Sequence, residues 1–113
     1  MKKSPQFRVV LVTAPTIKVA RQLAKIALTN RAVACANLIP RIESHYWWKN
    51  KLEKSAEVLI LFKTRASKLE DLEKLILQNH PYDTSEVVAL NITSGSKRFL
   101  DWLATETTSR TPR

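Results

Sequence analysis

The chain has 113 residues, of which 44% are hydrophobic and 26% charged, a composition that indicates one folded domain and excludes a disordered segment. Its one cysteine excludes an intrachain disulfide, and its one glycine, Gly95, excludes the glycine-rich loops that bind phosphates or dinucleotides, so no organic cofactor is expected. Nineteen Lys and Arg against ten Asp and Glu give a charge of +9, which is typical of a well-solvated surface or of a site for a polyanion.

The first half of the chain predicts a strand, a helix and a long hairpin. The predicted elements are a strand over 7–13, a helix over 17–30, and a hairpin whose strands cover 33–48 and 52–64. Thr16 is suited to cap the helix. Pro40 predicts a bend or bulge in the first hairpin strand, and Asn50 predicts the turn, because Asn tolerates left-handed backbone.

The second half predicts a helix over 68–79, a strand over 86–93 and a last helix capped by Ser96. Ser67 and Glu70 fit a capping box at the start of the first of these helices. A turn is expected over 94–96, and the tail is expected to be loose from about Thr107. The whole chain, 1–113, is predicted to be one domain with its core over about 7–104 and loose termini.

The order strand-helix-strand-strand-helix-strand predicts a ferredoxin-like α+β fold with an additional C-terminal helix. Such a fold places two helices on one face of a four-stranded antiparallel sheet. The hairpin is longer than this sheet needs, and long strand edges are usually covered by another chain, so a homo-oligomer is expected. No apolar stretch is long enough for a membrane span or a secretion signal, so a cytoplasmic location without membrane contact is expected.

Few residues are candidates for metal or covalent chemistry, and none forms a clustered motif such as CxxC or HExxH. Cys35 lies in an apolar strand, where it is either a small buried side chain or a metal ligand or reactive thiol. His80 lies at a predicted helix end, where it either interacts with the helix dipole or, with Asp83 or Glu86, supplies imidazole and carboxylate to a divalent ion. Subunits that meet at an axis would multiply these ligands.

Two further segments combine aromatic or basic residues. Tyr46 and Trp48 are predicted to lie on one face of their strand and Trp47 on the other, which suits core or subunit packing, or base stacking on RNA. Residues 63–65 (KTR) end a strand beside a helix start, where they are either solvated or bind an anion. No RNA-binding signature accompanies the aromatic residues, which disfavours nucleic acid.

Five segments together resemble the CutA divalent-cation tolerance family over about residues 7–104. They are residues 34–40 (ACANLIP), 46–48 (YWW), 63–65 (KTR), 80–83 (HPYD) and 86–90 (EVVAL). The resemblance implies a ferredoxin-like subunit in a tight trimer that the long hairpins hold together. It also implies a link to tolerance of copper and other divalent cations, and we expect a protein that is not an enzyme.

The resemblance implies roles for single residues as well. Cys35 falls on the family's recurrent cysteine, a proposed metal ligand, and His80, Asp83 and Glu86 complete the expected ligand set, with copper favoured. The remaining matched residues are assigned to the cleft between subunits: Tyr46, Trp47, Trp48, Lys63, Thr64, Arg65 and Tyr82. The alternative function is a trimeric signalling module that binds a small anion or a protein partner at these clefts.

Overall fold

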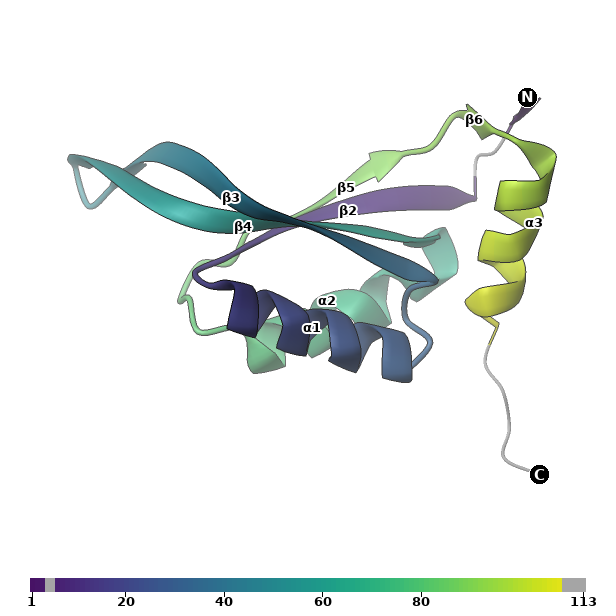
Figure 1. Ribbon diagram of the computed structural model, residues 1–113, viewed down its shortest axis with the longest axis horizontal. Helices are drawn as coiled ribbons and strands as arrows, with labels where there is room; N and C mark the ends of the chain where they lie inside the picture. The colour runs from purple at the N-terminus through teal and green to yellow at the C-terminus, as the bar shows by residue number, and fades with distance from the viewer. Residues whose placement is uncertain (4–5, 109–113) are drawn as a thin grey trace.

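A four-stranded antiparallel sheet, in the order β3-β4-β2-β5, carries helices α1 and α2 on one of its faces (Figure 1). The structure is a computed structural model and describes residues 1–3 and 6–108. The elements are β1 (Lys2–Lys3), β2 (Phe7–Ala14), α1 (Ile17–Thr29), β3 (Cys35–Trp48), β4 (Lys51–Arg65), the 3-10 helix η1 (Ala66–Lys68), α2 (Leu69–Asn79), β5 (Val87–Asn91), β6 (Ser94–Gly95) and α3 (Lys97–Glu106). This order and strand arrangement confirm the predicted ferredoxin-like fold with an additional C-terminal helix.

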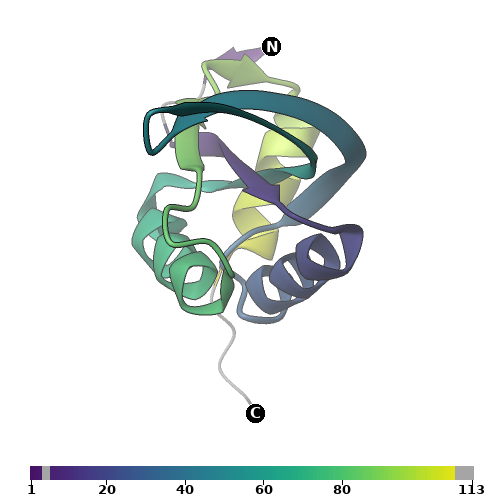
Figure 2. The same ribbon diagram turned by 90° about the vertical axis from the view of Figure 1, so that its left-hand side faces the viewer.

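The main core lies between the sheet and the two helices. Alternate residues of the central strands face the helices and are fully buried, among them Val10 and Val12 of β2 and Ile60 and Phe62 of β4. The side of α1 that faces them is rich in alanine, which lets the helix lie close to the sheet. Figure 2 shows α1 and α2 side by side beneath the sheet, where Leu72 and Ile76 of α2 complete the core.

The hairpin of β3 and β4 extends beyond the region that the helices cover (Figure 1). Its register shifts between Ile39 and Ile42, so the bulge predicted at Pro40 is confirmed. Lys49 and Asn50 form the tip with φ of 49° and 63°, and this left-handed backbone at two successive residues is typical of a tight hairpin turn. Asn50 was therefore correctly assigned to the turn.

Three local predictions were wrong. The capping box at Ser67 does not form, because η1 precedes α2 and Lys68 occupies the cap position without a side-chain hydrogen bond. Ser94–Gly95 is not a simple turn, because it pairs with Lys2–Lys3 as a short second sheet. Thr107 is not loose: it is buried, and its Oγ1 donates to the Leu103 carbonyl at 2.8 Å. The rest of the expected loose tail, residues 109–113, lies outside the described residues.

The face of the sheet opposite α1 and α2 is apolar and largely uncovered; we call it the open face. Its apolar residues are Val9, Leu11, Ile39, Leu59, Leu61, Val88 and Leu90, and Cys35, Asn37 and Lys63 share it. Ile39, Val88 and Leu90 expose 40%, 46% and 49% of their surface. An apolar sheet face of this extent is typical of a surface that another protein chain covers.

Candidate functional site

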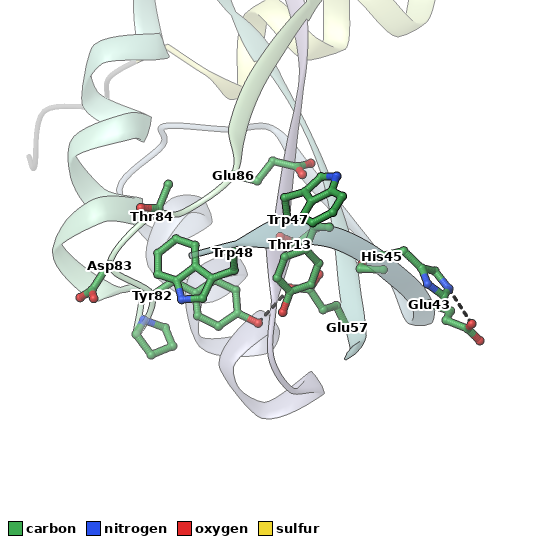
Figure 3. Close-up of a pocket in the computed structure, with 13 residues that line it drawn as sticks. Thr13, Glu43, His45, Trp47, Trp48, Glu57, Tyr82, Asp83, Thr84 and Glu86 are labelled. Atoms are coloured by element: carbon green, nitrogen blue, oxygen red, sulfur yellow. Dashed lines mark hydrogen bonds and ion pairs between the residues drawn. The ribbon is translucent and has the colours of Figure 1, made fainter. Parts of the chain in front are cut away.

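A cavity of about 830 Å³ lies where the projecting hairpin passes the loop that follows α2 (Figure 3). The hairpin contributes residues 43–48 of β3 and Glu57 of β4, while β2 contributes Thr13. The loop contributes Pro81, Tyr82, Asp83, Thr84 and Glu86. The cavity thus collects the predicted aromatic triplet and three of the predicted loop residues at one place.

A buried carboxylate and a phenol form the cavity's best-defined contact. Glu57 is only 8% exposed, and the Tyr82 hydroxyl donates to its Oε2 at 2.8 Å. Burial, followed by the hydrogen bond and the negative charge of Glu57, raises the pKa of Tyr82 well above its ordinary value. Tyr82 therefore stays a neutral donor at physiological pH and fixes the orientation of the carboxylate.

His80 holds the start of the loop against the sheet. Its Nε2 lies 2.7 Å from the Thr13 carbonyl oxygen, and the Tyr82 backbone N–H donates to its Nδ1 at 3.1 Å. Because Nδ1 accepts, Nε2 carries the proton and donates. Both ring nitrogens are thus engaged, and a metal ion would bind His80 only at the loss of one of these hydrogen bonds.

The cavity is negatively charged although the chain is strongly basic. Four of the ten acidic residues line it, namely Glu43, Glu57, Asp83 and Glu86. No Lys or Arg in the described part of the chain lines it, although Lys54 Nζ lies 4.0 Å from Glu43 Oε1. Asp83 and Glu86 are exposed at its rim. This distribution favours a cation in the cavity and disfavours an anion.

Cys35 lies far from His80 within one chain. Cys35 stands opposite Lys63 of β4, which in turn pairs with Val9 of β2. His80 contacts Thr13 of β2. Val9 and Thr13 are four residues apart on that strand, a separation of ~13 Å. The Cys35 Sγ lies 3.8 Å from Asn37 Oδ1, which also accepts from Lys63 Nζ. Burial raises the pKa of the Cys35 thiol, and the Lys63 charge offsets only part of this effect.

The expected metal ligands therefore do not form one centre in a single chain. Within residues 1–3 and 6–108, no three His, Cys, Asp or Glu side chains come close enough together to hold a metal ion. Cys35 lies on the open face, while His80, Asp83 and Glu86 lie at or beside the cavity. A site that uses both sets would need more than one chain.

The basic segment at the end of β4 has structural contacts. The buried Thr64 hydroxyl donates to the Ala32 carbonyl at 2.6 Å. The Arg65 guanidinium donates to the Ala104 carbonyl and, at 2.8 and 2.9 Å, to the hydroxyls of Thr107 and Thr108. Arg65 thus satisfies polar groups at the end of α3, as cations at helix C-termini do. These contacts leave the anion-binding interpretation without support.

The aromatic triplet has the predicted alternation. Tyr46 and Trp48 stand opposite Glu53 and Lys51, whereas Trp47 stands opposite Leu52 on the other face. Tyr46 and Trp48 are each 42% exposed and Trp47 is 73% exposed. A single chain therefore leaves all three rings accessible.

Sequence reasoning missed Glu57 as a site residue. A signal for it existed, because Glu57 is in phase with Leu59 and Leu61, and an acid on an otherwise apolar strand face requires a partner. That partner, Tyr82, is 25 residues away along the chain, so the pair could not be identified without the fold.

Replacing Arg65 by alanine is expected to loosen α3. The change removes charge-assisted hydrogen bonds to the end of this helix and is expected to lower the free energy of unfolding by about 2 kcal/mol. Urea unfolding of Arg65→Ala beside Arg41→Ala, an exposed arginine on the hairpin, is the measurement. Equal stability of the two variants would contradict the capping role.

The fold and the cavity together define a class of protein: a ferredoxin-like α+β domain with an open apolar sheet face and a projecting aromatic hairpin. No helix among the described residues has the length and apolar character that crossing a membrane requires.

Residues 8–106 match the family model described as "CutA1 divalent ion tolerance protein". The chain is 41% identical over 99 residues to "Protein CutA 1, chloroplastic" of Oryza sativa subsp. japonica, covering 88% of this chain and 56% of that protein. It is 38% identical over 99 residues to "Divalent-cation tolerance protein CutA" of Thermus thermophilus, covering 88% of this chain and 96% of that protein. The chain therefore belongs to the CutA1 divalent ion tolerance family.

Solved structures agree with this assignment. The crystal structure of CutA1 from Oryza sativa superposes with a TM-score of 0.89 at 39% identity, covering 93% of this chain and 96% of that one. The Thermus thermophilus protein gives 0.84 at 38% identity, covering 86% and 94%. The chain spans about half the length of the first curated relatives that it matches.

Proposed function

We propose that this chain forms a cytoplasmic homotrimer that serves divalent cation tolerance by binding a divalent cation, with copper favoured, and that it is not an enzyme. The observation that carries the proposal is the position of Cys35 on the open face. A side chain on that face meets a neighbouring chain when the face is covered, so the neighbour can supply ligands that one chain lacks.

The open face supports the assembly on physical grounds. Its seven apolar side chains remain partly or largely exposed, and removing them from water is the main driving force for association. The hairpin adds the exposed Trp47 and Leu52, which stand opposite each other across its strands. Aromatic residues of this kind are enriched where chains meet.

The donor chemistry supports a soft or borderline metal. A cysteine thiolate suits copper or zinc better than a hard cation. Asp83 and Glu86 are the exposed carboxylates that a neighbouring chain would bring to Cys35. The thiol and His80 are too far apart within one chain to act as a nucleophile and its base, which supports a role other than catalysis.

A calorimetric titration with Cu(II) under nitrogen, with Zn(II) as a redox-inert comparison, tests the metal proposal. We expect saturable binding with a fixed ratio per chain, weakened at least about tenfold in Cys35→Ser. His45→Ala should leave the affinity unchanged, because that ring is exposed and its Nε2 lies 2.8 Å from Glu43 Oε1 on the same strand of the hairpin. Heat no larger than the buffer control, or equal binding in Cys35→Ser, would contradict the proposal.

The same titration has an expected pH dependence. Because burial raises the pKa of the Cys35 thiol, the group is protonated at neutral pH, and metal binding must release that proton. The apparent affinity should therefore rise with pH, by up to about tenfold per pH unit while the thiol remains protonated. This dependence should disappear in Cys35→Ser.

A further inference from the structure

We propose that the cavity between the hairpin and the loop after α2 binds an organic ammonium ion, an alkylated amine that retains at least one N–H. This inference goes beyond the proposed function, which places a metal ion at Cys35. The metal proposal depends on Cys35 and this one on Glu57, so a variant of either residue tests one proposal without the other.

The cavity has the size and the walls of a small-molecule site. Its volume of about 830 Å³ is within the ~300–1,000 Å³ of typical ligand pockets. Tyr46, Trp48 and Tyr82 provide three aromatic rings; Trp47 also lines the cavity but projects from the other face of β3. Rings of Trp and Tyr attract an ammonium group placed over their faces, and they pack against its alkyl substituents. The walls therefore suit a ligand that is both apolar and positively charged.

The sign of the ligand's charge follows from the lining. Four carboxylates face or border the cavity, and no Lys or Arg among residues 1–3 and 6–108 does, although the overall charge of the chain is +9. Negative charge gathered in this way within a basic protein attracts cations and repels anions. Figure 3 shows the hydrogen bond between Tyr82 and Glu57, which places one carboxylate next to an aromatic ring of the cavity.

Glu57 indicates that the cation carries an N–H group. This side chain is more than nine-tenths buried, and its Oε2 accepts the hydrogen bond from Tyr82. Within residues 1–3 and 6–108, its other oxygen, Oε1, has no hydrogen bond or ion pair. A buried carboxylate oxygen without a partner is costly, and an ammonium N–H at this position would satisfy it.

A metal ion uses these features less well than an amine. No three metal-binding side chains gather within the part of the chain that the structure describes, and aromatic faces do not ligate a hydrated divalent cation. An alkylammonium ion uses the rings and the buried carboxylate at once. The chemistry of the cavity therefore favours the amine.

Titration calorimetry of the full chain in its native oligomeric state, with n-butylammonium chloride as the probe, tests this proposal. We expect saturable binding that n-butanol, the neutral analogue, does not show. Glu57→Gln should weaken binding at least about tenfold, because it removes the charge that faces the ammonium group. Trp48→Leu should weaken it about three- to tenfold through the loss of one aromatic wall.

Glu53→Gln is the matched control, because Glu53 lies on the same strand outside the cavity and its variant should bind like the wild type. Cys35→Ser should also bind the amine normally, and Glu57→Gln should keep its Cu(II) affinity, which separates the two proposals. The amine proposal is overturned if n-butanol binds equally well or if Glu53→Gln and Glu57→Gln behave alike. A titration that shows no saturable binding overturns it too. This outcome includes the case in which a lysine of a second copy of the chain occupies the cavity and excludes the amine.

Discussion

Replacing Leu61 by aspartate is expected to convert the proposed trimer to single chains. Leu61 lies in the middle of the open face, between Asn37 of β3 and Leu11 of β2. In the assembly that we propose, the new carboxylate would be buried without a partner, which costs several kcal/mol for each chain. A cost of ~4 kcal/mol corresponds to about a thousandfold weaker association.

Light scattering after gel filtration measures this effect directly. The wild type should have three times the mass of one chain, and Leu61→Asp the mass of one. The control is Gln22→Asp, which introduces the same charge on the exposed side of α1, away from the open face, and should leave the trimer intact. If Leu61→Asp remains trimeric, the open face is not the surface that joins the chains.

The second large effect is expected in the core. Phe62 is fully buried, and its neighbours across the sheet are Val10 and Ala36. Phe62→Ala should lower the free energy of unfolding by about 3–5 kcal/mol through lost transfer energy and the cavity that remains. Because a domain is stable by only ~5–15 kcal/mol in total, much of the stability depends on this one ring.

Phe99→Ala provides the matched comparison, since the same ring is removed from a side chain that is 40% exposed on α3. Its expected cost is about 1 kcal/mol, mostly from the contact with Trp102 at a centroid distance of 5.7 Å. Urea unfolding of both variants should be compared at one protein concentration, because assembly makes stability depend on concentration. Similar costs for the two variants would contradict the placement of the core.

Local sequence patterns predicted most of the fold because the residues that determine these features are close in sequence. The helix caps at Thr16 and Ser96 are confirmed. In each cap the side-chain oxygen accepts from the backbone N–H three residues later, so the local sequence was enough to predict it. The position of Asn50 at the hairpin tip was predictable for the same reason, because a tight turn depends on residues that are adjacent in sequence. The cap at Ser67 was wrong because η1 shifts the start of α2, and that shift depends on packing beyond the local sequence.

The candidate site was only partly predictable because its contacts join distant residues. The aromatic triplet and the loop residues Tyr82, Asp83 and Glu86 do meet at one cavity. Two contacts could be identified only from the fold. His80 contacts Thr13, 67 residues away, and the Tyr82 hydroxyl donates to Glu57. The contact of Arg65 with the end of α3 could likewise be identified only from the fold.

The separation of Cys35 from His80 is the most consequential of these results. The sequence predicted that Cys35 begins a strand and that His80 ends a helix, but not how far apart the two side chains lie. The sheet register places Cys35 near Val9 of β2, through Lys63, whereas His80 contacts Thr13 at the other end of that strand. In the function that we propose, a cation site that includes Cys35 is therefore completed by the neighbouring chain. This dependence is the central claim of the functional proposal.

The most direct test is the amount of Cu(II) bound per chain by the wild type and by Leu61→Asp, measured at equal chain concentration after both have been shown to fold. We expect saturable binding by the wild type and at least about tenfold weaker binding by the separated chains, although they retain Cys35, His80, Asp83 and Glu86. Equal affinity in both proteins would contradict it, because the site would then be complete within one chain.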